Sequence, residues 1–125
     1  MPVRWTIAHA ERLVTVRAEG PVALKAIEAY FDDLVVSNAM PYRKLFDARG
    51  VEPQLSDADM MLLGARVSAY AAMDPRGPIA VVVNSDAAFA VVSRFANLGN
   101  ARRSLKIFEA IDEARLWLDL QPAVT

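Results

Sequence analysis

A serine and two aspartates, Ser56, Asp57 and Asp59, stand in the stretch SDAD, where a loop gives way to a predicted helix. A serine at such a position could accept a phosphoryl group and act as a chemical switch. It could also cap the helix, because its hydroxyl can accept a hydrogen bond from a backbone N–H of the first turn. The two acids suit the positive end of a helix and would repel a phosphate. We therefore interpret Ser56 as a helix cap, with the switch as the alternative.

Polar side chains also follow two predicted strands at their carboxyl ends. Ligands of open α/β sheets bind outside these ends, so a candidate functional surface lies there. It comprises Asp47, Ser56, Asn84 and Ser85. The alternative, which we favour, is that strand-to-helix turns use Asp, Asn and Ser for capping alone.

Residues for catalysis or metal binding are sparse. His9 is the only histidine, it falls in a predicted hairpin turn, and there is no cysteine. The usual metal sites need several His or Cys ligands. The five glycines are widely spaced, so there is no glycine-rich phosphate loop. We predict a protein that is not an enzyme and that uses no cofactor or metal.

The predicted second helix contains four consecutive apolar residues, Met60, Met61, Leu62 and Leu63. Such a run covers more than one face of a helix, and methionine adapts to ligands of varied shape. The run could be covered on both sides by the core. It could instead form the interface of a homodimer or line a pocket for a small apolar ligand.

Composition and charge exclude several classes of protein. The formal net charge is −1, which does not suit a nucleic-acid-binding protein. A basic group could receive an acidic partner or a lipid head group, but we prefer a solvated sheet edge protected by cations; it comprises Arg94, Arg102, Arg103 and Lys106. The most apolar short run, residues 79–83, is too short to span a membrane, and the N-terminus lacks the apolar stretch of a signal peptide. We expect a soluble cytoplasmic protein.

Hydrophobic periodicity predicts one α/β domain over residues 1–125, with a mixed sheet of about five strands and four helices in the order β-β-α-β-α-β-α-β-α. The strands are predicted at 3–8, 13–18, 42–47, 78–84 and 104–108, and the helices at 22–37, 57–73, 86–98 and 111–120. The first two strands alternate apolar and polar residues across a short turn, which is typical of a hairpin. The stretch PIAVVVN is continuously apolar, which indicates a strand covered on both faces.

Four stretches together resemble a known family: ERLVTVRAEGPV, YRKLFDARG, GPIAVVVNSD and KIFEAIDEARLWL. The layout resembles the STAS domain of bacterial anti-sigma-factor antagonists and, more narrowly, the SpoIIAA-like family, which is related by fold to CRAL-TRIO lipid-binding domains. The most specific piece is the pattern F-x-x-x-x-E-A-x-x-W-L from Phe108 to Leu118. In the antagonists, a serine after the strand-end aspartate is phosphorylated. Here Asp47 matches that aspartate, but the following loop is longer and Ser56 is not followed by glycine, so the switch role is not transferred.

The resemblance and the residues together predict a non-catalytic binding or regulatory module. It would act through its surface on a protein partner or on a second copy of itself, as a homodimer. The alternative is a small carrier that holds a lipid or another apolar ligand between sheet and helices, as the CRAL-TRIO relationship suggests.

Overall fold

The computed structural model of the protein describes residues 2–73, 77–98 and 105–121. A five-stranded sheet, ordered β1-β2-β4-β6-β7, forms its centre. The strands are β1 (Val3–Ala8), β2 (Leu13–Ala18), β4 (Arg43–Asp47), β6 (Ile79–Val82) and β7 (Leu105–Phe108). The helices are α1 (Leu24–Val36), α2 (Asp57–Met73), α3 (Asp86–Leu98) and α4 (Ile111–Asp119). The predicted α/β class, with a mixed sheet of five strands and four helices among the described residues, is confirmed.

The sheet begins with the predicted antiparallel hairpin and continues with parallel strands. β1 pairs antiparallel with β2, with Val3 opposite Ala18, and β2, β4, β6 and β7 run parallel to one another. The turn between β1 and β2 is short, and Arg12 adopts a left-handed conformation there, with φ of 52°. The alternating pattern of β1 and β2 thus produces one apolar face, which contains Trp5 and Val16, and one polar face.

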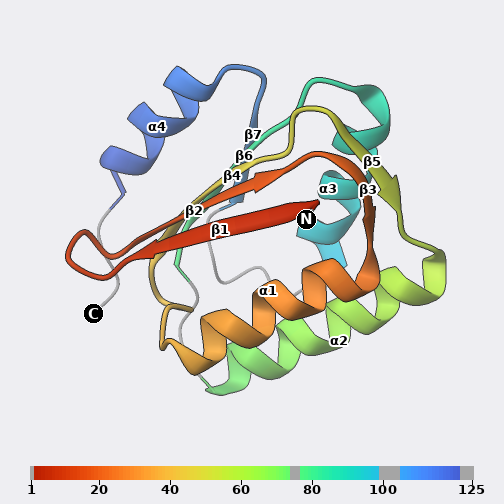
Figure 1. The fold of residues 1–125 in the computed structure, drawn as a ribbon, viewed down its shortest axis with the longest axis horizontal. Coiled ribbons are helices and arrows are strands. Elements are labelled where there is room, and N and C mark those ends of the chain that lie inside the picture. Colours follow the sequence, from red (N-terminus) through yellow and green to blue (C-terminus); the bar gives the residue numbers. More distant parts are fainter. Residues whose placement is uncertain (1, 74–76, 99–104, 122–125) are drawn as a thin grey trace.

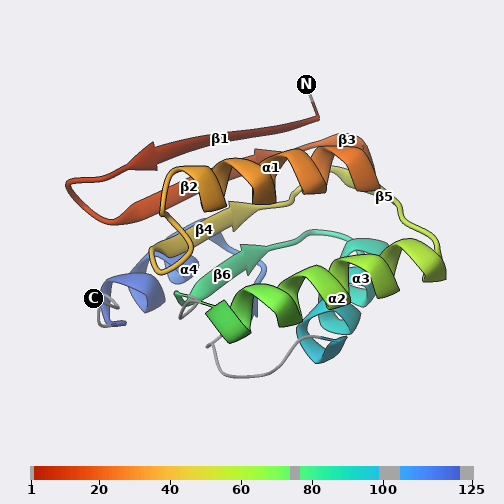
Figure 2. The ribbon, with the colours of Figure 1, turned by 90° about the horizontal axis from the view of Figure 1, so that it is seen from below.

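Helices cover the two faces of the sheet unequally (Figures 1 and 2). α1, α2 and α3 lie on one side, whereas α4 lies alone on the other. Val81 points to the three-helix side, and its neighbours Ala80 and Val82 pack with Ala114 and Leu118 of α4. All four residues of β6 are buried, so the prediction that this strand is covered on both faces is confirmed.

Two further short strands, β3 (Gly20–Ala23) and β5 (Val51–Gln54), form a small parallel sheet of their own. Neither strand was predicted, and the prediction that the first helix begins at residue 22 was wrong, because α1 begins at Leu24. Gly20 and Gly50 both have positive φ, and Gly20 N–H donates to Gly50 O over 2.9 Å, so the two glycines bring these segments together. Each strand contains a proline, which only edge strands tolerate, and α1 begins after this pair ends.

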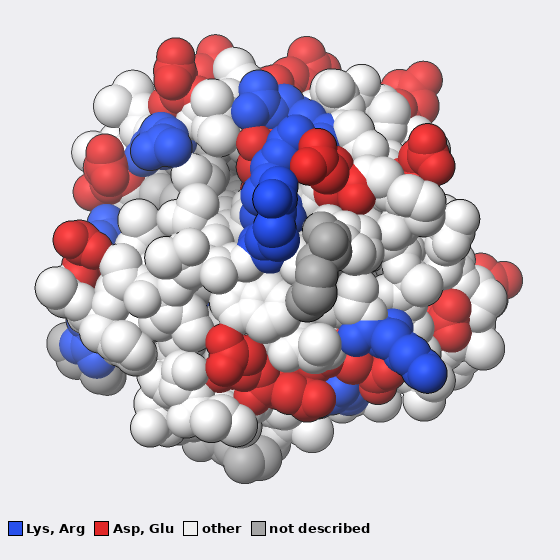
Figure 3. All heavy atoms as spheres, in the orientation of Figure 1, with Lys and Arg blue, Asp and Glu red and all other residues white. Residues whose placement is uncertain are grey.

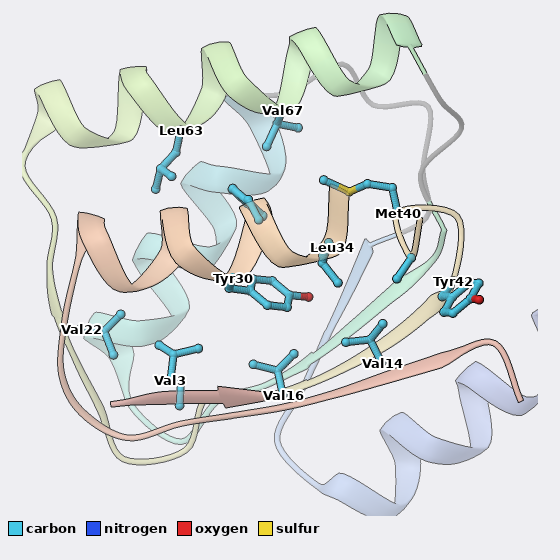
Figure 4. Packing of buried hydrophobic residues seen from close by; sticks show 13 residues of the cluster. Val3, Val14, Val16, Val22, Tyr30, Leu34, Met40, Tyr42, Leu63 and Val67 are labelled. Atoms are coloured by element: carbon cyan, nitrogen blue, oxygen red, sulfur yellow. The ribbon is translucent and has the colours of Figure 1, made fainter. Parts of the chain in front are cut away.

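The main core lies between the sheet and helices α1 and α2 (Figure 4). Val14 and Val16 on β2 point toward Leu34 and Tyr30 of α1, and Leu63 projects from α2 into the same layer. On the opposite side of the sheet, Phe108 and Trp117 pack with ring centroids 5.9 Å apart. The F-x-x-x-x-E-A-x-x-W-L pattern is therefore a packing motif that docks α4 onto β6 and β7.

Candidate functional site: an apolar cavity beneath three helices

A cavity of about 120 Å³ lies between the sheet and helices α1, α2 and α3, and it is partly open to solvent. Its walls are almost wholly apolar. Aliphatic contributors include Ile27, Leu55, Met60, Leu63, Val67 and Val92. Native interiors are close-packed and contain few voids larger than a water molecule. A cavity of this size is therefore a feature that ordinary packing does not explain.

The exposure of Phe46 independently marks the same cavity. Phe46 lies on β4, between β2 and β6, and faces the side of the sheet that carries three helices. A side chain at the centre of a covered sheet should be fully buried. Leu45, which precedes Phe46 and faces α4, is fully buried. Phe46 is only half-buried. Solvent therefore reaches the middle of the sheet from the three-helix side.

Five aromatic rings line the cavity, from the sheet and from each of the three helices: Tyr30, Phe31, Phe46, Tyr70 and Phe95. Phe31 contacts two of the other rings. It stacks on Phe95, with ring centroids 6.3 Å apart, and meets Tyr70 edge to face, with centroids 6.0 Å apart. Tyr30 meets Phe46 edge to face at 5.9 Å. Such pairs favour offset or perpendicular geometries because of the ring quadrupole.

Lys44 is the one charged residue among the described residues that line the cavity. It is only 2% exposed, and its Nζ donates to the carbonyl oxygens of Met40 and Tyr42 over 2.6 and 2.7 Å. A buried ammonium requires such acceptors, because an unpaired charge in an apolar interior is very costly. The backbone at residues 40–42 thus stabilises the cation at the start of β4.

Ion pairs tie together the helices that cover the cavity. Arg66 of α2 reaches Glu28 and Asp32 of α1, and its Nε donates to Tyr70 Oη over 2.9 Å. Arg94 of α3 pairs with Asp57 at the start of α2, at 2.6 Å. These ion pairs therefore link α1 to α2 and α2 to α3 at the surface.

The four residues of the predicted polar surface have separate local roles. Ser56 Oγ accepts from Asp59 N–H and Asp59 Oδ2 accepts from Ser56 N–H, both at 3.0 Å, which is a capping box. The interpretation of Ser56 as a cap is confirmed. Ser85 Oγ likewise accepts from Ala88 N–H at 3.1 Å and caps α3, and Asn84 Oδ1 accepts from Gly50 N–H. The bonds of Ser56 and Ser85 are caps of the kind that strand-to-helix turns use, whereas Asn84 contacts a residue 34 positions away in the chain.

Asp47, the fourth of these residues, anchors a row of alternating charges. It is 7% exposed, and the guanidinium of Arg49 donates to its Oδ1 over 2.9 Å and to its Oδ2 over 2.8 Å. The guanidinium of Arg17 lies 2.9 Å from Oδ1. Arg17 also contacts Glu19, which pairs with Arg4. Figure 3 shows basic and acidic side chains side by side over β1 and β2.

The charge of Asp47 is stabilised by this arrangement. Burial raises the pKa of the Asp47 carboxyl, but the hydrogen bonds from the side chain and backbone of Arg49, with the charges of Arg17 and Arg49, outweigh burial. The pKa of Asp47 therefore lies below its ordinary value of 3.8. The same hydrogen bond raises the pKa of Arg49.

The apolar run of α2 is divided between two environments. Met60 and Leu63 are buried and line the cavity, whereas Met61 is 69% exposed and Leu62 is 55% exposed. The helix is therefore covered on one side only. Phe89 of α3 is another large exposed apolar side chain, 52% exposed.

No family model and no curated protein matches the chain in sequence. Its fold is similar to the crystal structure, at 2.25 Å resolution, of an uncharacterized DUF3478-family protein from Shewanella loihica PV-4 with a SpoIIAA-like fold. The two superpose with a TM-score of 0.59 over 93% of each chain, at 18% sequence identity. The chain has a SpoIIAA-like fold. The predicted fold resemblance is confirmed, and at this level of identity the likeness concerns the fold alone.

On this SpoIIAA-like scaffold, the predicted basic group divides into separate parts. Arg94 pairs with Asp57, and Lys106 Nζ lies 5.4 Å from the ring centroid of Phe108 on the edge strand β7. Arg102 and Arg103 fall outside the described residues. The described members thus have partners within the chain. The interpretation of the whole group as a solvated sheet edge stays a prediction, as does its alternative, a surface for an acidic partner or a lipid head group.

His9, the one histidine of the chain, is not among the residues that line the cavity. His9 is exposed in the β1–β2 turn, with Nδ1 2.8 Å from Tyr42 Oη. Within the described ranges, no group of three or more His, Asp or Glu side chains could hold a metal ion. None of the helices in that same part of the chain is long and apolar enough to cross a membrane.

Sequence reasoning missed the aromatic lining of the cavity. Tyr30, Phe31 and Phe95 were visible as apolar helix positions, but a core explains such positions equally well. Whether inward-facing rings fill a core or surround a space depends on how far apart the helices are held. That distance depends on contacts between residues far apart in the chain, such as those of Phe31 of α1 with Tyr70 of α2 and Phe95 of α3.

Proposed function

We propose that this protein is a non-catalytic binding module whose cavity accepts a small apolar molecule between the sheet and helices α1, α2 and α3. The observation that supports this most directly is the half-buried Phe46 in the middle of a covered sheet, beside a cavity of about 120 Å³. An engineered apolar cavity of about 150 Å³ in another protein stays dry and binds benzene. Size and lining are thus suited to an apolar guest.

The lining also disfavours a reaction in the cavity. Catalysis needs a nucleophile or an acid–base pair placed beside the bound molecule. Lys44 is the charged member of the described lining, and its Nζ is bonded to two backbone carbonyls. Burial of apolar surface, at roughly 25 cal/mol per Å², would supply the affinity. Binding without chemical conversion is therefore the function that we propose.

Methyl-detected NMR of the protein tests this function. Benzyl alcohol and its saturated counterpart cyclohexylmethanol are soluble, neutral probes of suitable size. As its concentration is raised, at least one of the two probes should shift the methyl signals of Leu63 and Val67, and the shifts should reach saturation. Native mass spectrometry of the freshly purified protein should then reveal any retained molecule.

Cavity filling provides the matched control for this experiment. Val92→Phe places a ring in the cavity, while Val36→Phe makes the same change at a position that is 80% exposed. The first variant should lose binding and the second should keep it. If neither probe binds the unmodified protein, the proposal is wrong.

The exposed pair Met61 and Leu62 favours a second candidate function, self-association through α2. Neighbouring exposed apolar side chains can mark an interface between subunits. Analytical ultracentrifugation would report a dimer that Leu62→Lys dissociates. A monomer at all accessible concentrations would exclude this candidate without affecting the cavity proposal.

A further inference from the structure

The composition of the cavity walls narrows the class of ligand. From the geometry of these walls we infer that the ligand is a neutral aromatic molecule of one or two rings, rather than an aliphatic chain or an anion. This inference rests on the proposed function, because it concerns the same cavity. Three features of the cavity support it: aromatic rings on several sides, a lining with one charged residue among those described, and a volume of about 120 Å³.

Aromatic rings approach the cavity from several directions. Phe46 comes from the sheet, Phe31 from α1, Tyr70 from α2 and Phe95 from α3. Their mutual geometry is already the one that rings favour, with Phe31 stacked on Phe95 and perpendicular to Tyr70. A planar guest between sheet and helices would therefore have aromatic rings on several sides, and rings attract one another in offset-stacked and edge-to-face contacts. A saturated guest gains only the burial of its surface.

The charge of the lining argues against an ionised ligand. The ammonium of Lys44 donates to the carbonyl oxygens of Met40 and Tyr42, and the other described lining residues are uncharged. A carboxylate entering this space would lose its water and would have to compete with those backbone carbonyls for the ammonium. Burial of an ion without well-placed partners is strongly unfavourable. The lining thus favours a neutral molecule.

The volume sets the size of the ligand. A cavity of about 120 Å³ is close in volume to the engineered cavity, about 150 Å³, that holds a single benzene ring. The cavity is also partly open, and Leu55, Tyr70 and Phe95 along it are half-buried. A second ring or a polar substituent could therefore extend toward solvent, whereas a long lipid chain would lie mostly outside the cavity.

Four probe molecules in two matched pairs separate the effect of aromaticity on affinity from the effect of charge. Benzyl alcohol and cyclohexylmethanol differ only in the ring, and benzoate and cyclohexanecarboxylate repeat that pair with a negative charge. Affinities are measured by NMR titration of the intact protein at neutral pH. Benzyl alcohol should bind about two- to twelvefold more tightly than cyclohexylmethanol, which is the range expected from aromatic pairing. It should also bind more tightly than benzoate.

Two matched substitutions on α3 test the role of the rings. Phe95→Leu removes a ring that lines the cavity, and Phe89→Leu removes one that is 52% exposed outside it. The first should bring the affinity ratio of benzyl alcohol to cyclohexylmethanol toward one while cyclohexylmethanol still binds. The second should leave the ratio unchanged.

The outcomes distinguish this inference from the proposed function. If both neutral probes bind equally, or the saturated one binds more tightly, the cavity binds apolar molecules but the aromatic class is wrong. If benzoate binds more tightly than benzyl alcohol and Lys44→Met removes that advantage, the neutral class is wrong. If no probe binds, the proposed function itself fails.

Discussion

The ring of Phe46 meets that of Tyr30 edge to face, with centroids 5.9 Å apart and planes inclined by 78°. The pair joins β4 to α1 across the layer where the cavity lies. Phe46 is nevertheless half-buried, because the neighbouring helices do not close over it. The two rings thus hold the helix at a distance from the sheet without filling the space beside them.

Filling the cavity should stabilise the protein. Val92→Phe adds apolar surface where there is already room, so we expect the free energy of unfolding to rise by about 0.5–2 kcal/mol, the usual gain from cavity filling. Val36→Phe, on the exposed side of α1, should change it by less than about 0.5 kcal/mol. Urea denaturation of both variants gives the comparison. A clear loss of stability in Val92→Phe would mean that this part of the structure is already closely packed.

Replacing Arg66 should loosen α2 from α1. Arg66→Met keeps the aliphatic stem but removes the contacts to Glu28, Asp32 and Tyr70. Because these groups are partly exposed, we expect a loss of only about 1 kcal/mol, and the difference should shrink at high salt. Denaturation at low and high ionic strength measures it. Arg115→Met, on the exposed surface of α4, is the control and should have little effect.

Replacing Ser56 should affect stability alone. Ser56→Ala removes the acceptor for Asp59 N–H, and the loss of a helix cap costs about 1 kcal/mol. Ser68→Ala, at an exposed position inside α2, should be neutral or slightly stabilising because alanine favours helices. Thermal unfolding of both variants, with a benzyl alcohol titration, tests this. A Ser56→Ala variant of unchanged stability would show that the hydroxyl does not cap the helix to any energetic effect.

The sequence was informative where one residue pattern has one structural solution. The alternation of β1 and β2 could only bury one face, and the continuous apolarity of β6 required cover on both faces. The capping box at Ser56 was equally local, because its two hydrogen bonds join residues three apart. Each of these features depends on neighbours in the chain, so each was predictable.

The features that were missed depend on distant contacts. β3 and β5 are paired by residues about thirty apart, and their glycines and prolines ordinarily indicate loops. The division of the run from Met60 to Leu63 into buried and exposed residues depends on which side of α2 meets the sheet. The cavity itself depends on the spacing of three helices. Periodicity identifies inward-facing residues but not how closely the opposing surfaces approach.

The ion pairs of Asp47 should make stability depend on pH. Because the pKa of Asp47 is depressed in the folded state, its contribution is fully present above the ordinary value of 3.8 and is lost as pH falls through the lower folded value. Asp47→Asn should therefore cost about 1–2 kcal/mol at pH 7, and this difference should diminish below about pH 4. Urea denaturation at pH 7, 5 and 3 measures the effect.

Glu52→Gln, the same kind of change at an exposed position of β5, is the control. Its free energy of unfolding should stay within about 0.5 kcal/mol of that of the unmodified protein at pH 7. An Asp47→Asn variant that is equally destabilised at pH 7 and pH 3 would show that Asp47 acts through its shape and hydrogen bonds, with no contribution from its charge.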